Sequence, residues 1–158
     1  MDFQVNPFSC GNHIHYENYL RFSAVADAVH GHAFTHVVVD EVEGQSRISG
    51  FISLRASSLL SNDGEAVRGD AALEIVELAV DKRCEKTGVG TLLLDYAVAL
   101  AEHLNEYYLS ARYIVLCADR QAAAFYERYG FRRVTDYGDV PHNGANDDCI
   151  PMFLKIKT

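Results

Sequence analysis

No stretch of this sequence is long and apolar enough to span a membrane. The first residues, Met1-Asp2-Phe3-Gln4, also lack the basic and apolar regions of a secretory signal. The cysteines are few and scattered, and no Cys-x-x-Cys motif occurs among Cys10, Cys84, Cys117 and Cys149. We therefore expect a cytoplasmic protein that uses no membrane and keeps four free thiols in a reducing compartment.

Positive charge is also scarce. Lysine and arginine number 14 against 22 aspartates and glutamates, which gives a formal net charge of −8. This balance disfavours broad electrostatic capture of nucleic acid and suits a cationic substrate better. The length of 158 residues and the 49% hydrophobic content indicate a single globular domain over residues 1–158.

Two common phosphate-binding motifs are missing. No P-loop is present, and a dinucleotide fingerprint starting at Gly88 would need a third glycine where Leu93 stands. What is present is a strand pattern over Leu73–Val80, the turn Gly88-Val89-Gly90 and an amphipathic helix pattern that follows. A helix N-terminus exposes unpaired N–H groups, and glycines let an anion approach them. The turn therefore predicts a pyrophosphate site.

The segment before this turn predicts a helix and a hairpin. Apolar residues recur from Ile14 to Val29, and Gly31 is a suitable residue after a helix end. Residues 43–46 predict the turn of a hairpin. Its two strands are expected over Phe34–Asp40 and Ile48–Ala56. The polar residues 57–70 indicate a surface loop.

The rest of the chain predicts a further α/β segment. A helix is expected over Arg120–Tyr129, with Asp119 as its N-cap and Gly130 just after its end. The turn-forming residues of 136–149 predict a mobile loop or a long hairpin connection. Strands are expected over Ala111–Ala118, Phe131–Thr135 and Ile150–Ile156.

Three short motifs together resemble the GCN5-related N-acetyltransferase (GNAT) family. They are Glu77-Leu78-Ala79-Val80, Gly88-Val89-Gly90 and Phe125-Tyr126-Glu127-x-x-Gly130-Phe131. The resemblance is strongest over Leu73–Val134. It implies an α/β fold with a GNAT-like mixed, mostly antiparallel central sheet and flanking helices. It also implies an enzyme that moves an acetyl group from acetyl-CoA to a primary amine by direct attack.

The resemblance also implies which residues hold acetyl-CoA. Backbone groups of Leu78, Ala79 and Val80 would bind the pantetheine arm, and Asp119 stands where the family often has an Asn that touches this arm. Lysines and arginines beside the turn, namely Lys82, Arg83 and Lys86, would add positive charge. The pyrophosphate would lie on Lys86, Thr87, Gly88, Val89, Gly90 and Thr91. One departure is Glu85, where the family usually has Gln or Arg, because a carboxylate there repels phosphate. Either Glu85 turns outward, or Lys86 and Thr87 provide the side-chain contacts.

Three side chains are catalytic candidates. By the resemblance, Tyr126 lies beside the sulfur of coenzyme A and protonates the departing thiolate, and it is the favoured candidate; a core aromatic is the alternative interpretation. Glu74 and Glu77 are candidates for the base that removes a proton from the amine. They lie three residues apart, so a regular strand points them to opposite faces, and either one is also explained by a salt bridge or by solvent exposure.

Metal binding is not expected. His13-x-His15 and His30-x-His32 lack Cys or carboxylate partners at ligand spacing.

The acceptor has competing interpretations. A small-molecule, antibiotic or peptide amine is favoured, because the chain is acidic, and a homodimer is considered. Toxin-type GNAT proteins that acetylate aminoacyl-tRNA are the first alternative, since Phe8-x-Cys10-Gly11, Ser49–Leu54 and Leu78–Asp81 resemble them. That alternative would bring an antitoxin partner and contact with nucleic acid. The second alternative is a non-catalytic module that binds acetyl-CoA.

Overall fold

The structure is a computed structural model that describes residues 8–11, 13–62, 66–134 and 149–157. The chain divides into two compact units. Unit 1 contains Met1–Arg55 and Val76–Tyr96, and unit 2 contains Ala56–Ile75 and Ala97–Thr158. Among the described residues, six strands form one sheet in the order β1 (Phe34–Val42), β2 (Gln45–Asn62), β3 (Val67–Val80), β4 (Tyr113–Ala118), β6 (Ile150–Lys155) and β5 (Arg132–Arg133). Strands β3 and β4 pair in parallel. The pairs β1–β2, β4–β6 and β5–β6 are antiparallel, so the expected mixed sheet with flanking helices is confirmed.

Unit 1 begins with one continuous helical segment. It consists of α1 (Ile14–Asn18), a π-helical turn (Tyr19–Ser23) and α2 (Ala24–His30). The segment ends at Gly31, whose φ of 71° is left-handed and whose amide donates to the carbonyl of Ala28. This end is the one that the sequence predicts, because glycine adopts the left-handed conformation without steric cost.

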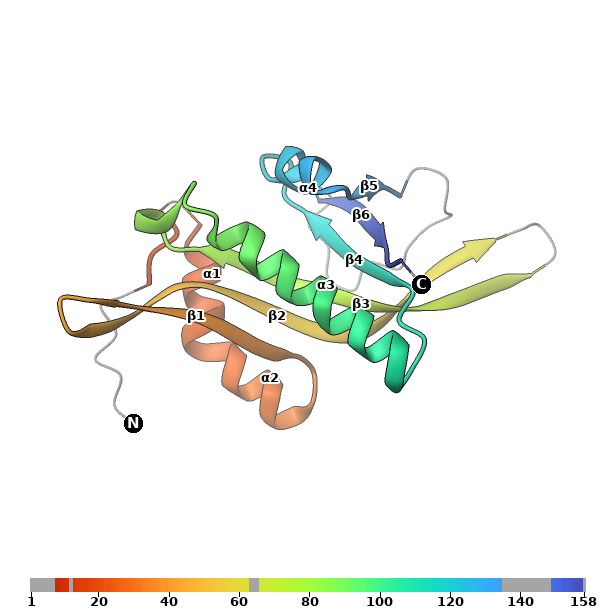
Figure 1. Ribbon diagram of the computed structural model, residues 1–158, viewed down its shortest axis with the longest axis horizontal. Coiled ribbons are helices and arrows are strands. Elements are labelled where there is room, and N and C mark those ends of the chain that lie inside the picture. Colours follow the sequence, from red (N-terminus) through yellow and green to blue (C-terminus); the bar gives the residue numbers. More distant parts are fainter. Residues whose placement is uncertain (1–7, 12, 63–65, 135–148, 158) are drawn as a thin grey trace. The chain divides into compact units, whose positions relative to one another are not determined.

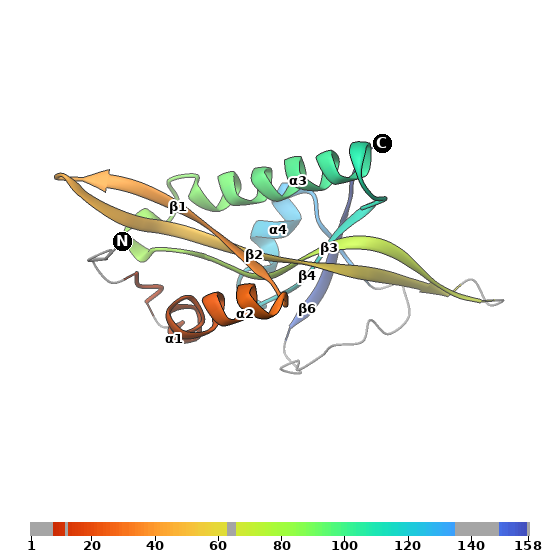
Figure 2. The same cartoon turned by 90° about the horizontal axis from the view of Figure 1, so that it is seen from below.

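A β-hairpin follows the helices. It joins β1 (Phe34–Val42) to β2 (Gln45–Asn62) through Glu43 and Gly44, which both have positive φ. Figures 1 and 2 show α1 and α2 on one side of these strands, and the start of α3 (Val89–Tyr107) on the other. The predicted hairpin is therefore confirmed, with both strands longer than expected.

The prediction of a loop over residues 57–70 is wrong. In the structure β2 runs to Asn62, and β3 (Val67–Val80) already starts at Val67. The physical reason is Leu59, which is 1% exposed and packs in a cluster with Ala72 and Val115. The polar residues around Leu59 hide this buried position from a reading of composition alone.

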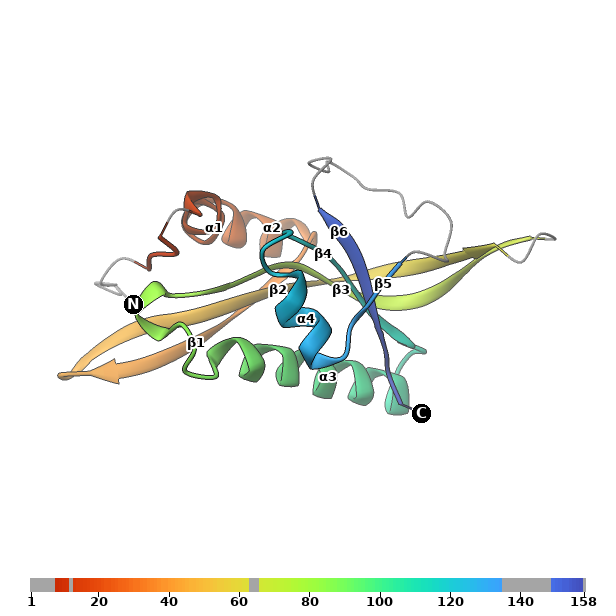
Figure 3. The ribbon, with the colours of Figure 1, turned by 90° about the horizontal axis from the view of Figure 1, so that it is seen from above.

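Unit 2 contains β4 (Tyr113–Ala118), which pairs in parallel with β3 and antiparallel with β6 (Ile150–Lys155). The short strand β5 (Arg132–Arg133) pairs with the other edge of β6. Helix α4 (Ala123–Tyr129) connects β4 to β5, as Figure 3 shows. The predicted strands and helix are thus present, in shorter form. Residues 135–148, which include most of the predicted loop, lie outside the described residues.

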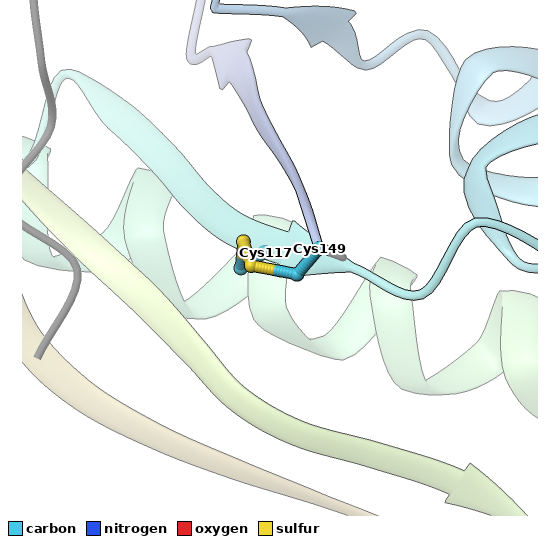
Figure 4. Close-up of a disulfide and its surroundings, with 2 residues drawn as sticks. All are labelled: Cys117 and Cys149. Atoms are coloured by element: carbon cyan, nitrogen blue, oxygen red, sulfur yellow. A yellow bond between two sulfur atoms is a disulfide. The ribbon is translucent and has the colours of Figure 1, made fainter. Parts of the chain in front are cut away.

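Two cysteines form a disulfide, which contradicts the expectation of four free thiols. Cys117 near the end of β4 is bonded to Cys149 just before β6, with Cα atoms 5.4 Å apart (Figure 4). The antiparallel pairing places Cys117 opposite Pro151, so Cys149 comes within disulfide reach despite 32 residues of separation. Cys10 and Cys84 are free and buried.

Within the described residues, no helix is long and apolar enough to cross a membrane.

Candidate functional site

The turn between β3 and α3, residues 81–91, is called the anion turn below. Its first residue, Asp81, is fully buried and organises it. The Asp81 carboxylate accepts hydrogen bonds from the Arg83 side chain and amide and from the Ser9 amide, while the Asp81 amide donates to Ser49. Burial alone would raise the pKa of Asp81, but these hydrogen bonds outweigh it and hold the pKa below its ordinary value.

Arg83 is committed to Asp81. Its Nε lies 2.7 Å from Oδ1 and its terminal nitrogen lies 2.8 Å from Oδ2. Arg83 therefore anchors the turn, instead of serving mainly as a phosphate cation beside Lys82 and Lys86. Those two lysines are exposed, and so is Glu85. The carboxylate of Glu85 is thus in solvent, which is one of the two arrangements that the sequence left open.

The second half of the anion turn presents backbone N–H groups. Lys86 and Gly88 both have positive φ, of 61° and 94°. The Gly88 carbonyl accepts the amide of Leu92 at 2.9 Å, so α3 begins directly after Gly88. The amides at the start of a helix precede its first internal hydrogen bond, which leaves them free for an anion. A Cβ added to Gly88 would meet nothing within 4 Å, so the space beside these amides is open.

Gly50 on β2 is a positioning residue that the sequence analysis missed. A Cβ at this position would lie 2.7 Å from Cγ1 of Val89, 3.1 Å from Cδ1 of Leu93 and 3.1 Å from the carbonyl oxygen of Ala79. The missing side chain lets the first turn of α3 pack directly on β2 and β3. A glycine inside a strand pattern is the signal that could have revealed this close approach.

The end of β3 carries the residues expected at the pantetheine arm. Ala79 is buried in a cluster with Phe8, Cys10 and Phe51, whereas Leu78 and Val80 are half-buried. The Cys10 thiol donates to the Val80 carbonyl at 3.7 Å. Burial, with the nearby charges of Glu17, Asp81 and Glu85, raises the pKa of Cys10 to about 12, so it stays a thiol. Cys10 is therefore not a nucleophile at neutral pH.

Glu74 and Glu77 are both half-buried on β3. The recorded pairing between β3 and β4 extends from Ala72 to Ile75, so Glu74 lies within it, opposite Val115. Glu77 follows that pairing and precedes the segment Leu78–Val80. Exposure does not separate the two glutamates, and both stay candidates for the base.

Tyr126 is 7% exposed and lies on α4. Its ring packs edge-on against Phe125 and Phe131, with centroids 5.2 and 5.6 Å away. Its carbonyl accepts the amides of Gly130 and Phe131, and Gly130 has a φ of 121°. The Phe-Tyr motif therefore forms a short helix whose predicted end at Gly130 is confirmed.

Asp119 is not in the N-cap position of α4, so that prediction is wrong. The helix starts at Ala123, with Ala122 in the N-cap position. The backbone carbonyl of Asp119 accepts the amides of Ala122 and Ala123 at 2.9 and 3.1 Å. A turn thus precedes the helix, and it leaves the Asp119 side chain exposed.

The histidines are partly engaged in local contacts. His30 Nδ1 lies 2.7 Å from the carbonyl oxygen of Ala26, and His36 Nδ1 lies 3.1 Å from the hydroxyl of Tyr96. Among the described residues, no group of three or more His, Cys, Asp or Glu side chains is arranged to hold a metal ion.

The model of the acetyltransferase (GNAT) domain family matches residues 31–133, which is well over half of the chain. No curated protein matches the sequence. Solved structures match over nearly the whole chain. A bacterial toxin has 22% identity and a TM-score of 0.76, covering 94% of this chain and 81% of its own. A Tyr-to-Phe mutant of KacT has 14% identity and a TM-score of 0.75, with 95% and 86% covered.

A third similar structure is AtaT complexed with acetyl-methionyl-tRNAfMet, with 16% identity and a TM-score of 0.68, covering 91% of this chain and 84% of the other. At these identities the likeness establishes the fold. The open space at Gly88, the amides at the start of α3 and the exposed Lys82 and Lys86 fit the pyrophosphate of acetyl-CoA. The chain belongs to the acetyltransferase (GNAT) family, and it is an acetyl-CoA-dependent N-acetyltransferase.

Proposed function

We propose that the acceptor is the α-amino group of an aminoacyl-tRNA, as in a toxin-type acetyltransferase. The observation that carries this proposal is a local excess of positive charge in two segments of unit 2, residues 112–133 and 149–157. The described residues 112–133 and 149–157 contain two carboxylates, Asp119 and Glu127, against seven cations. All seven are exposed: Arg112, Arg120, Arg128, Arg132, Arg133, Lys155 and Lys157. Two of them have acidic partners, because Arg112 lies 3.8 Å from Asp70 and Arg133 lies 2.7 Å from Glu127. Screening confines electrostatic attraction to about 8 Å at physiological salt, so this local balance matters more than the net charge of −8.

Part of this charge lies beside aromatic rings. Arg132 pairs with Phe153, and Tyr113 pairs with Lys155, so these four side chains emerge on one face of the sheet. The rings of Tyr113 and Phe153 are 6.0 Å apart. Arg133 points to the opposite face, where it binds Glu127 of α4 at 2.7 Å. The two rings are half-buried against the cluster of Leu59, Ala72 and Val115, so the exposed Arg132 and Lys155 are the groups offered to phosphates.

The comparisons add support for a tRNA acceptor. AtaT is solved with acetyl-methionyl-tRNAfMet and with a segment of its antitoxin AtaR, and KacTA is solved with DNA. By analogy, this chain would also bind a protein antitoxin. The analogy rests on fold, so the charge distribution described above carries the argument.

Acetyl-CoA supplies the acetyl group as a thioester. We assign its pyrophosphate to the amides of Val89, Gly90 and Thr91, with Lys86, Thr87 and Gly88 beside them. The backbone of Leu78, Ala79 and Val80 would bind the pantetheine arm, and the exposed Asp119 would contact it.

The proton transfers are assigned to side chains. An α-amino group has a pKa of about 8, against about 10.4 for lysine, so it loses its proton more readily at neutral pH. Glu77 or Glu74 would accept this proton, directly or through water. Tyr126 would donate a proton to the departing thiolate, whose ordinary pKa is about 8.5.

Incubation with labelled acetyl-CoA and a set of charged tRNAs tests the acceptor. We expect N-acetylated aminoacyl-tRNA, identified by mass spectrometry after nuclease digestion. Arg132→Ser should raise the KM for tRNA and reduce the salt dependence of binding by about one phosphate contact. Arg21→Ser, which removes an exposed cation from the helical segment of unit 1, is the matched control and should change neither.

A small cationic amine is the second candidate, because the net charge is −8. Rapid acetylation of polyamines or basic peptides, without modification of any charged tRNA, would establish this candidate and contradict the tRNA proposal.

A further inference from the structure

The guanidinium of Arg47, on β2, is poorly satisfied by the groups around it. The side chain is half-buried, and its Nη2 donates to the Cys84 sulfur at 3.6 Å, although a thiol sulfur is a weak acceptor. Its Nε is buried, and among the described residues it has no hydrogen-bond partner. Asp40 lies opposite Arg47 in the hairpin, but no described carboxylate forms an ion pair with Arg47. An anion beside this guanidinium would satisfy it better.

A β-bulge directs Arg47 toward the face of the sheet on which α3 packs. Ile48 and Phe51 lie three residues apart, which would place them on opposite faces of a regular strand, yet both pack in the same cluster. The register of β1 with β2 shifts between Gly50 and Ile48, so the extra residue, Ser49, reverses the alternation. Arg47 therefore shares a face with Gly50, where an added Cβ would meet the first turn of α3.

This placement brings Arg47 against the anion turn. Cys84, which the guanidinium contacts, is 5% exposed. The Cys84 carbonyl accepts the amide of Thr87 at 3.3 Å and its hydroxyl at 2.6 Å. Arg47 thus contacts a residue that is hydrogen-bonded to Thr87, directly before the open space at Gly88. Arg47 and the whole anion turn belong to unit 1.

The anion turn itself offers few cations to a phosphate. Arg83 is committed to a buried carboxylate. Lys82 and Lys86 are exposed, and the exposed carboxylate of Glu85 opposes part of their charge. A guanidinium presents paired N–H donors that match two oxygens of one phosphate. Arg47 is therefore suited to supply charge that the turn lacks.

We propose that Arg47 binds a phosphate group of acetyl-CoA. On binding, its terminal N–H groups exchange the Cys84 sulfur for phosphate oxygens, which are ionised and are stronger acceptors. The backbone amides of the anion turn fix the phosphates from one strand connection, and Arg47 adds a charge from β2. The pyrophosphate and the 3′-phosphate of coenzyme A share this chemistry, and a comparison of two ligands separates them.

Calorimetry with coenzyme A tests the contact. Arg47→Met keeps an unbranched apolar side chain and removes the charge, so Kd should rise about 10-fold and depend less on salt. Arg47→Lys keeps the charge without the paired donors, so it should recover the salt dependence and part of the affinity. Arg55→Met is the matched control, because Arg55 is also a half-buried arginine of β2, and it should change neither. An unchanged Kd in Arg47→Met would overturn the proposal.

Thermal melts without ligand separate binding from packing. We expect the Tm of Arg47→Met to equal or exceed that of the parent, because the variant removes a buried donor that has no partner among the described residues. A lower Tm, together with an Arg47→Lys variant that binds coenzyme A no better than Arg47→Met, would assign Arg47 to packing alone and contradict the proposal.

3′-Dephospho-coenzyme A identifies the phosphate. If Arg47→Met weakens binding of this ligand as much as it weakens binding of coenzyme A, the contact is with the pyrophosphate. If parent and variant bind it equally, the contact is with the 3′-phosphate. Both results support Arg47 as a phosphate ligand.

Discussion

The guanidinium of Arg83 donates two hydrogen bonds to the carboxylate of Asp81, and the backbone amide of Arg83 donates a third at 2.9 Å. Because Asp81 is fully buried, this pair closes the start of the anion turn. The Ser9 amide also donates to Asp81 at 3.1 Å, so the pair joins the N-terminal segment to the turn.

Asp81→Asn should therefore destabilise unit 1 and change its response to acid. The folded-state pKa of Asp81 is lowered, so its contribution is complete above the unfolded pKa of about 3.9 and is lost as pH falls through the folded pKa. We expect the variant to lose about 2 kcal/mol at pH 7. Urea unfolding at several pH values measures this. The gap between parent and variant should narrow below about pH 4, and a gap constant from pH 7 to 2 would contradict the assignment.

Gly50→Ala should weaken acetyl-CoA binding through the position of α3. The added methyl group would collide with Val89 and approach the carbonyl of Ala79, which pushes the first turn of the helix outward. Overpacking of this kind costs about 1–3 kcal/mol. Calorimetry should show a higher Kd, and acetyl-CoA should stabilise the variant less than the parent in thermal melts.

Gly69→Ala is the control for this change. Gly69 also lies in a strand, but its added Cβ would meet its nearest neighbour, Leu60, at an ordinary 3.5 Å. Its effect on acetyl-CoA affinity should be negligible. Equal losses in the two variants would mean that Gly50 does not position the helix.

Tyr126→Phe should lower turnover and leave acetyl-CoA affinity nearly unchanged. The phenyl ring keeps the packing against Phe125 and Phe131, while the proposed proton donor is lost. General acid catalysis is typically worth ~10²–10⁴-fold, and thioesters with more acidic thiols should lose less. Tyr129→Phe, on the same helix, is the control. If Tyr126→Phe keeps full turnover when the chemical step is rate-limiting, Tyr126 serves only in packing.

Glu74→Gln and Glu77→Gln separate the two candidate bases. The residue that accepts the amine proton should, when changed, lower kcat and remove the acidic limb of the pH–rate profile. Change of the other should leave that limb in place. If both variants keep the limb, neither glutamate is the base, and water or another group accepts the proton.

The Cys117–Cys149 disulfide should stabilise unit 2. It closes a span of 32 residues that contains α4, and chain-entropy arguments assign about 3–4 kcal/mol to such a loop. Dithiothreitol should lower the Tm of the parent chain. The variant with Cys117→Ser and Cys149→Ser should already have the lower Tm and should not respond to dithiothreitol. Identical melts for the parent with and without reductant would mean that the bond contributes nothing.

The local motifs were determined by the sequence alone. Gly31 and Gly130 end helices because glycine adopts positive φ without cost, and this preference depends on the adjacent residues. The anion turn is recognisable because Gly88 precedes a strongly amphipathic helix. The Phe125-Tyr126 motif and the alternation of the hairpin strands are likewise contained within short windows. These signals sufficed for the family and for the α/β class.

Contacts between distant segments were decided only by the tertiary structure. Leu59 extends β2 because it packs on Ala72 and Val115, and Cys117 meets Cys149 because β4 pairs with β6. Gly50 has no side chain, so the first turn of α3 packs closely on β2 and β3 at this position. Asp119 is not at the predicted N-cap position, because its backbone carbonyl forms a turn and α4 starts only at Ala123. Each of these contacts joins residues that lie many positions apart in the sequence. Packing and strand register bring such residues together, and a local sequence pattern does not contain this information.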